Sequence, residues 1–259
     1  MGTGIGVGIA GQVYDLKPGG STPPPSFTNL YAMKFDNNPL GNNQFLEPTA
    51  TPLLGSGGSG PWTISFWFYA NALGSTNQRL VDINQGAGGG ADRLQIYINT
   101  SNVLAVAGVW TDNYNSFALS TATWYNLIYR YDGSNVAGFV INGTNIDNKT
   151  GVGTSNFSTS GNTRIGRNSA GGQFDGYMDE FSIWGTELSD AECNEIYNSG
   201  TPADLSASSM AGNLRHWWRM GDPNGTSYYP AIPDAGLAGS IDLTMTNMVA
   251  GNIQTVIVP

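Results

Sequence analysis

Gly172–Tyr197 reads GQFDGYMDEFSIWGTELSDAECNEIY, and this stretch decides the fold. It joins a glycine-punctuated turn, an alternating strand expected over Met178–Trp184, and a short capped helix. Ser189 is a natural N-cap, and Glu192, three residues later, can return a hydrogen bond to the backbone N–H of Ser189. Asp190 lies where the helix dipole favours an anion. The pattern predicts one short helix over residues 189–198, directly after a strand.

Three further blocks extend this reading: Trp62–Ala70 (WTISFWFYA), Trp124–Gly143 (WYNLIYRYDGSNVAGFVING) and Thr163–Arg167 (TRIGR). The four blocks in this order resemble the concanavalin A-like, laminin-G-type jelly rolls, over roughly residues 27–200. The resemblance implies an all-β fold, a jelly-roll β sandwich with a single short helix. We expect residues 27–259 to form this one domain.

The C-terminal blocks carry a second resemblance. Thr201–Met248 contains TPADLSASS, LRHWWRMGD and IPDAGLAGSIDLTMTNM, and is similar to the C-terminal part of laminin-G-like proteins of phage particles. This similarity implies a location in the virion, on the particle surface, as a capsid decoration or tail-appendage (tail fibre) subunit.

Local patterns support the β reading. Large aromatic residues occupy both faces of Trp62–Ala70, as expected for a central strand that is covered on two sides. Asp132-Gly133 and Asn142-Gly143 accept the positive φ angles of tight turns, so they predict hairpins. A further hairpin is expected from residues 94–98 and 103–110, and the tail IQTVIVP is expected to pair as an edge strand.

Residues 1–26 differ from the rest of the chain. Glycines alternate with apolar residues there, and the segment ends in PGGSTPPPS, which favours a stiff extended conformation. Since Ile5, Val7, Ile9 and Val13 share one face of an extended strand, we expect an N-terminal arm that docks on other virion proteins. A disordered leader is the alternative. A cleaved signal peptide is not expected, because no basic residue precedes the apolar part.

Composition excludes several classes of protein. The net charge is −9 over 259 residues and only 11% of residues are charged, so the basic surface that binds nucleic acid is missing. No apolar run approaches the roughly 18–20 residues of a membrane span. Cys193 is the only cysteine, which excludes an intramolecular disulfide and predicts a small buried side chain.

The sequence favours a protein that is not an enzyme. The sole histidine, His216, has no second histidine with which to form a zinc site, and we expect it to be structural. Glycosidases of this fold need two carboxylates on one face. Asp179 and Glu180 are neighbours in a strand, so we expect them to point to opposite faces and to be unable to form that pair.

Asp179 and Glu180 match an acidic pair that the resembled family commonly shows before its last strand. One interpretation is structural, with hydrogen bonds from the backbone or from Arg164 or Arg167. The other is calcium, since many members of the resembled family hold this ion at the rim of the sandwich. The candidate ligands are then Asp36, Asp112 and Asp179, with Asn37 and Asn113 as further oxygen donors. Apart from this structural Ca²⁺, no cofactor is expected.

Aromatic residues in turn-rich segments are candidates for stacking against sugar rings: Trp110, Tyr114, Tyr228 and Tyr229. Most other aromatics are expected in the core: Trp62, Trp67, Trp124, Trp184, Trp217 and Trp218.

Three functions stay open at this point. The first is a non-enzymatic phage structural protein that forms a homo-oligomer in the particle and is docked by residues 1–26. The second, compatible with the first, is a lectin-like receptor-recognition module for host surface glycans. The third and weakest is a glycan hydrolase.

Overall fold

The computed structural model describes residues 27–36, 43–50, 53–54, 60–74, 76–84, 93–108, 112–114, 117–153, 162–168, 171–238 and 240–255. The predicted arm, with Ile5, Val7, Ile9 and Val13, lies outside the described residues. The statements below concern the described part alone.

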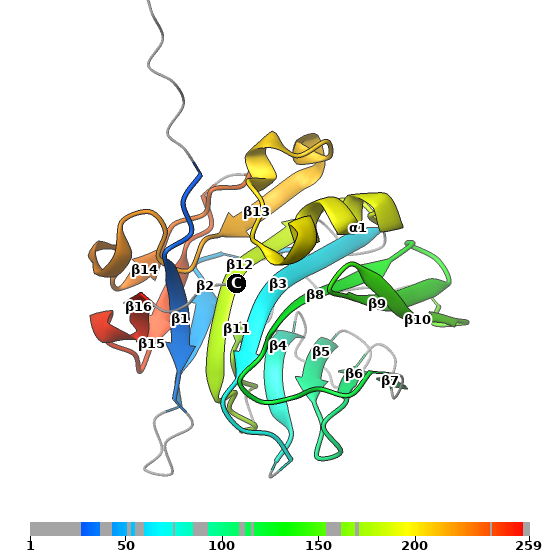
Figure 1. Cartoon of the computed structure of the whole chain (residues 1–259), viewed down its shortest axis with the longest axis horizontal. Coiled ribbons are helices and arrows are strands. Elements are labelled where there is room, and N and C mark those ends of the chain that lie inside the picture. The colour runs from blue at the N-terminus through cyan, green and yellow to red at the C-terminus, as the bar shows by residue number, and fades with distance from the viewer. Residues whose placement is uncertain are drawn as a thin grey trace, which may run out of the picture.

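Two antiparallel sheets stack face to face (Figure 1). The first sheet has the order β10 (Thr144–Thr150), β9 (Val136–Ile141), β8 (Trp124–Tyr131), β3 (Trp62–Ala70), β12 (Gly176–Trp184), β1 (Tyr31–Phe35) and β16 (Ile253–Thr255), and β13 (Leu214–Trp218) also pairs with β12. The second has the order β14 (Ala231–Ile232), β15 (Leu243–Thr246), β2 (Phe45–Pro48), β11 (Thr163–Ile165), β4 (Gln78–Asn84), β5 (Arg93–Ile98), β6 (Leu104–Gly108) and β7 (Asp112–Tyr114).

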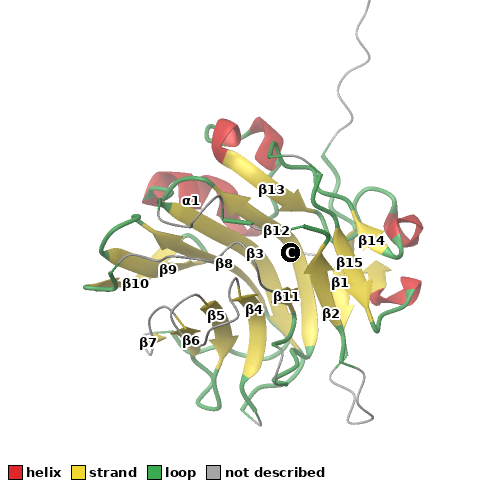
Figure 2. Ribbon diagram, turned by 180° about the vertical axis from the view of Figure 1, so that it is seen from behind, coloured by secondary structure: helices red, strands yellow, loops and turns green. Residues whose placement is uncertain are grey.

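The helical elements are few and short. They are α1 (Asp190–Tyr197) and the 3-10 turns η1 (Asn198–Gly200), η2 (Leu205–Ala207), η3 (Ala211–Asn213), η4 (Gly225–Tyr228) and η5 (Ala250–Asn252). The view from behind in Figure 2 shows them outside the space between the two sheets, with α1 against the outer face of the first sheet. The expected all-β jelly roll with one short α-helix is therefore confirmed. No helix in the described residues is long and apolar enough to cross a membrane.

The predicted helix cap is present in full. The Ser189 side chain accepts a hydrogen bond from the backbone N–H of Glu192, and the Glu192 carboxylate accepts one from Ser189 N at 2.7 Å. The helix ends at Asn198, which has the left-handed conformation with φ 45°.

The predicted hairpins are also confirmed. β8 and β9 pair across the Asp132-Gly133 turn, and β9 and β10 across Asn142-Gly143. Gly133, Asn142 and Gly143 have positive φ values of 88°, 49° and 73°, as tight turns require. Residues 253–255 of the C-terminal tail pair with β1 as the edge strand of the first sheet.

The main core lies between the sheets, and β3 is central in the first sheet, as predicted. Phe66 and Phe68 point into this core, where Phe66 stacks on Phe181 with ring centroids 5.2 Å apart. Of the six tryptophans expected in the core, five are buried: Trp62, Trp67, Trp184, Trp217 and Trp218. Trp124 is half-buried and packs against Tyr69 and Tyr177.

A second apolar cluster packs α1 onto the first sheet. Ile128 and Val140, which alternate with core residues of β8 and β9, contact Trp184, Cys193 and Ile196. Cys193 is fully buried, and this burial raises the pKa of its thiol to about 12. Cys193 is thus a buried apolar residue, as predicted.

Candidate functional site

One edge of β12 is shared between two strands. β1 pairs with Gly176–Met178 of β12, and β13 pairs with Phe181–Trp184. Asp179 and Glu180 lie in the gap, where neither strand reaches them. Figure 1 shows β1 and β13 diverging from this edge. We call this place the fork.

A β-bulge distorts β12 at the fork. Asp179 pairs with Trp67 of β3 and Ser182 pairs with Ser65, so two residues, Glu180 and Phe181, face the single residue Phe66. Glu180 has φ 49°, in the left-handed region. An extra residue of this kind changes the direction of the side chains that follow it.

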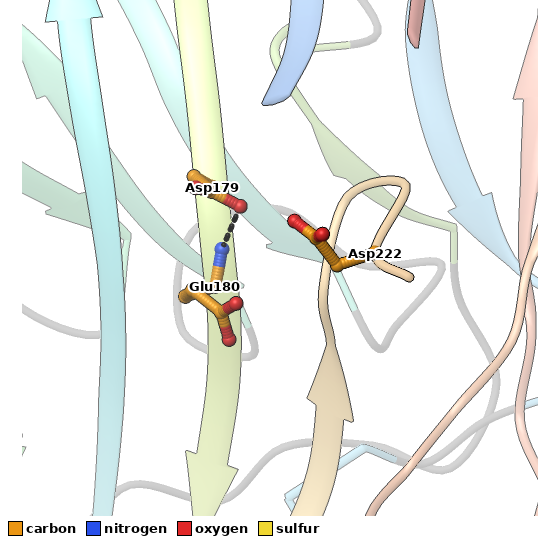
Figure 3. A group of neighbouring side chains, drawn as sticks. All are labelled: Asp179, Glu180 and Asp222. Carbon is orange, nitrogen blue, oxygen red and sulfur yellow. Dashed lines mark hydrogen bonds between the residues drawn. The ribbon is translucent and has the colours of Figure 1, made fainter. Parts of the chain in front are cut away.

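The prediction that Asp179 and Glu180 point to opposite faces is therefore wrong. Their carboxylates and that of Asp222 each offer an oxygen within 4.8 Å of the others (Figure 3). All three residues are buried, with exposures of 0%, 4% and 3%. We call Asp179, Glu180 and Asp222 the acid cluster.

Two members of the acid cluster bind the chain that enters β1. Asp222 accepts hydrogen bonds from the backbone N–H groups of Leu30 and Tyr31, at 2.9–3.1 Å. Asp179 accepts one from Asn29 Nδ2 at 2.9 Å and one from Glu180 N at 2.8 Å. The carboxylates thus provide partners for part-buried donors at the fork.

The third member, Glu180, binds two side chains of β13 and its continuation. Trp217 Nε1 donates to Glu180 Oε2 at 2.5 Å, and Arg219 Nε donates to Oε1 at 3.2 Å. Arg219 also donates to the Thr28 carbonyl, and its guanidinium lies 4.4 Å above the ring of Phe27. The sequence pointed to Arg164 or Arg167 as the basic partner, but both belong to the β11 region of the other sheet. The partner is Arg219.

Burial raises the pKa of each acid in the cluster. For Asp179 the pKa is raised well above its usual value by desolvation and by the neighbouring charge of Glu180. Desolvation raises the pKa of Glu180 to about 7, although Arg219 and Trp217 oppose the shift. Desolvation also raises the pKa of Asp222. The cluster therefore retains protons at a pH where free carboxyl groups have lost them.

A pocket of about 410 Å³ opens beside the acid cluster. Its wall includes Trp217, Arg219 and Asp222, which contact or belong to the cluster, and Phe27, whose ring is stacked on Trp217 with centroids 6.3 Å apart. The remaining lining residues are Thr28, Asp204, Ser206, Pro223, Tyr228, Pro233 and Ala235. Aromatic surface beside carboxylate, hydroxyl and guanidinium groups is the mixture that small polar ligands require. We call this cavity the fork pocket.

The described ones among the four aromatics predicted to bind sugar do not gather in one place. Tyr228 lines the fork pocket, and its neighbour Tyr229 is 44% exposed but is not part of the lining. Tyr114 belongs to β7, which lies at the opposite edge of the second sheet from β14, the strand that follows Tyr229. The side chain of Tyr114 and the whole of Trp110 lie outside the described residues. Phe27, Trp217 and Arg219, which line the fork pocket, were not predicted. Local patterns do not distinguish the two aromatic residues from core aromatics, and nothing in the sequence indicates that Arg219 lies beside Phe27.

The predicted calcium ligands are likewise not brought together. Asp36 follows β1 and pairs with Lys34 at 2.7 Å, whereas Asp179 lies in the fork. In the β1–β12 register Asp36 is four residues from the position opposite Asp179, which is about 13 Å along the strand. Asp112 is on the distant β7, and its side chain is not described.

Among the described residues, the acid cluster is the group that could hold a cation. Asn29 Oδ1, a buried oxygen with no hydrogen-bond partner, lies on the residue that binds Asp179. However, each carboxylate of the cluster already accepts at least two hydrogen bonds from protein donors. A bound calcium ion stays a prediction.

His216 lies next to the site but forms a separate pair. It is buried, and its Nδ1 is 2.7 Å from Asp234 Oδ2. Burial alone would raise the pKa of Asp234, but hydrogen bonds from His216, Trp217 N and Gly236 N outweigh it and lower the pKa. Asp234 thus orders the loop after β14, and His216 has the structural role that was expected.

The two stacked sheets, the single helix and the rim pocket define a lectin-like jelly roll. Residues 40–194 match the model of the family Laminin_G_3, the concanavalin A-like lectin/glucanases superfamily. The chain belongs to this family. A comparison with curated proteins found no match.

Solved structures show the same fold. A "putative carbohydrate binding protein" from Bacteroides ovatus is 19% identical with a TM-score of 0.66, and the match covers 90% of this chain and 62% of that protein. The chain thus spans about three fifths of that relative's length. A heptameric SAP-like pentraxin from Limulus polyphemus is 12% identical with a TM-score of 0.52, and the match covers 65% of this chain and 82% of the pentraxin.

Proposed function

We propose that the chain is a non-enzymatic saccharide-binding module and that the fork pocket is its binding site. The observation that carries the proposal is the lining of this pocket, which combines Phe27 and Tyr228 with the polar side chains of Asp204 and Ser206. A sugar ring offers an apolar face for an aromatic side chain and hydroxyl groups for carboxylates. A volume of about 410 Å³ falls in the range of small-ligand sites.

The acid cluster does not support hydrolysis. A glycosidase needs one carboxyl group to protonate the leaving oxygen and a second to attack or to activate water. Asp179 and Glu180 are both buried, and their oxygens are bound to Asn29, Trp217 and Arg219. We infer that these carboxylates hold the pocket wall in place instead of reacting.

The test is a glycan-array or cell-binding assay that compares Tyr228→Ala with Tyr229→Ala. Tyr228 lines the pocket and its exposed neighbour does not, so the first variant is expected to weaken binding about tenfold or more and the second to leave it unchanged. Thermal unfolding of each variant checks that the fold is retained. Trp110→Ala and Tyr114→Ala are tested as well. If these two variants alone lose binding, the binding site lies near β7 and not in the fork pocket. No binding by the unmodified protein would remove the proposal.

We further propose that this module is displayed on a phage particle, as a homo-oligomeric capsid decoration or tail-appendage subunit. The proposal is motivated by the sequence pattern of Thr201–Met248, which resembles phage laminin-G-like proteins, and this segment lies outside the residues 40–194 that the family model matches. Residues 1–26, with the apolar face of Ile5, Val7, Ile9 and Val13, would bind the capsid or tail. Deletion of residues 1–26 is expected to abolish incorporation into particles, measured by mass spectrometry of purified virions. Normal incorporation of the truncated chain would contradict the docking role.

A further inference from the structure

The charges around the fork pocket are unevenly distributed. Asp204 and Asp222 line it, and Asp179 and Glu180 lie directly behind Asp222. Arg219 is the basic residue of the lining, and its charge is already paired with Glu180 at 3.2 Å.

The pocket stays negative in either protonation state of the β12 carboxyl groups. If Asp179 and Glu180 hold protons, the carboxylates of Asp204 and Asp222 outnumber the single guanidinium of Arg219 at any pH above the raised pKa of Asp222. If they are ionised, the excess of negative charge is larger. The net charge of −9 for the whole chain adds a field of the same sign.

Two of the five N–H donors of Arg219 are already used. Its Nε binds Glu180, an Nη2 proton binds the Thr28 carbonyl, and the guanidinium lies against the rings of both Phe27 and Trp217. An arginine often binds a carboxylate or sulfate through two parallel N–H groups, one of them Nε–H. In Arg219 the Nε–H is already bound to Glu180, and the charge is paired with that carboxylate.

Sugar hydroxyl groups suit the same surroundings. Asp204 accepts hydrogen bonds from Ser206 N at 3.1 Å and Ser206 Oγ at 2.6 Å, both through Oδ1. Its Oδ2 can accept a hydrogen bond from a hydroxyl group of a ligand, and Ser206 is exposed. Acceptors of this kind bind hydroxyl donors and repel anions.

We propose that the fork pocket selects saccharides without an acidic group and rejects those that carry a carboxylate or sulfate. This inference rests on the proposed function of the pocket and adds the chemical class of its ligand. A negative charge placed a few ångströms from Asp204 and Asp222 is repelled through a medium that is only partly aqueous, which should weaken binding by about tenfold or more.

The experiment measures binding of the full chain to matched pairs of oligosaccharides on a glycan array. Each pair consists of a neutral oligosaccharide and the same oligosaccharide carrying sialic acid, a uronic acid or sulfate. The neutral member is expected to bind at least about tenfold more tightly at low salt, with a smaller ratio at 0.5 M NaCl because of screening. Asp204→Asn is expected to reduce the ratio of the two affinities severalfold because it removes a negative charge from the lining. The neutral sugars are expected to bind more weakly as well, since Asp204 accepts from their hydroxyl groups, so the ratio and not the affinity is the readout. Asparagine can keep the cap on Ser206 N, so the variant should fold.

Asp147→Asn is the matched control. It makes the same change of charge on β10, at the other end of the first sheet from the fork, and should leave the ratio unchanged. Equal or tighter binding of the acidic members, or a ratio that Asp204→Asn leaves unaltered, would overturn the inference. Absence of binding to every member of every pair would instead count against the proposed function itself.

Discussion

Glu180 is the residue on which the site depends. A side chain other than glycine in the left-handed region is disfavoured by roughly 1–2 kcal/mol, and glutamate carries no sequence signal for that conformation. Here the strain is offset by the contacts with Asp179, Trp217 and Arg219. The sequence revealed an acidic pair in a strand, but it could not reveal the bulge. For this reason the prediction for the two side-chain directions was wrong.

The stability of the protein should fall as the pH rises from 5 to 8. Glu180 has its pKa raised from 4.5 to about 7, and that of Asp179 is also raised. Between these values the folded state retains protons that the unfolded chain loses, so stability is present at low pH and is lost as the pH rises through 7. For Glu180 alone the loss is about 3 kcal/mol at most. Urea unfolding at pH 5, 6.5 and 8 measures it.

Glu180→Gln is the control for this pH dependence. Glutamine has nearly the same shape but does not titrate, so the variant should lose stability less steeply over the same pH range. Asp132 and Asp234 have lowered pKa values, and their effects lie below about pH 4. The titration of Asp132 and Asp234 therefore does not contribute to the change in stability between pH 5 and pH 8. A wild-type protein that is more stable at pH 8 than at pH 5 would contradict the assignment, as would an identical slope in both proteins.

At the scale of elements, the predictable parts are those whose signals are local. The capped helix, the Asp132-Gly133 hairpin and the central β3 strand follow from residues close together in the sequence. The fork depends on β1 and β13, which are far apart in sequence yet share one edge of β12. Alternation within a strand indicates which face is buried and not which strands are neighbours. The fork could therefore not be predicted.

Asp222 is expected to be the residue that holds the fork together. Asp222→Ala removes the acceptor for Leu30 N and Tyr31 N and leaves both donors partly buried without a partner. The expected loss is roughly 2–4 kcal/mol in free energy of unfolding, measured by urea denaturation. Asp222→Asn retains one acceptor oxygen and should lose less. Equal stability of Asp222→Ala and the wild type would show that the fork does not need this carboxylate.

At the scale of the whole molecule, the fork pocket combines segments that the sequence separates widely. Residues 27 and 28, residues 204 and 206, and seven residues between 217 and 235 contribute to its lining. Among the predicted sugar-binding aromatics, Tyr228 alone has a described place in it, because the argument from turn-rich segments cannot tell which turns meet in space. The prediction that six tryptophans lie in the core was correct for five of them, because a large apolar side chain is buried in almost any β sandwich.

The position at which the domain begins can be tested with two truncated chains. A chain of residues 27–259 keeps the stacking of Phe27 on Trp217 and every contact of residues 28–31 with the acid cluster and Arg219. It should unfold within about 2 °C of the full-length protein. A chain of residues 32–259 lacks these contacts and leaves Asp179 and Asp222 buried with fewer partners. Its melting temperature should fall by about 10 °C or more. Differential scanning calorimetry of the three proteins measures these melting temperatures.

If the melting temperature is already much lower in the chain that begins at residue 27, residues 1–26 are part of the folded domain and not a separate arm.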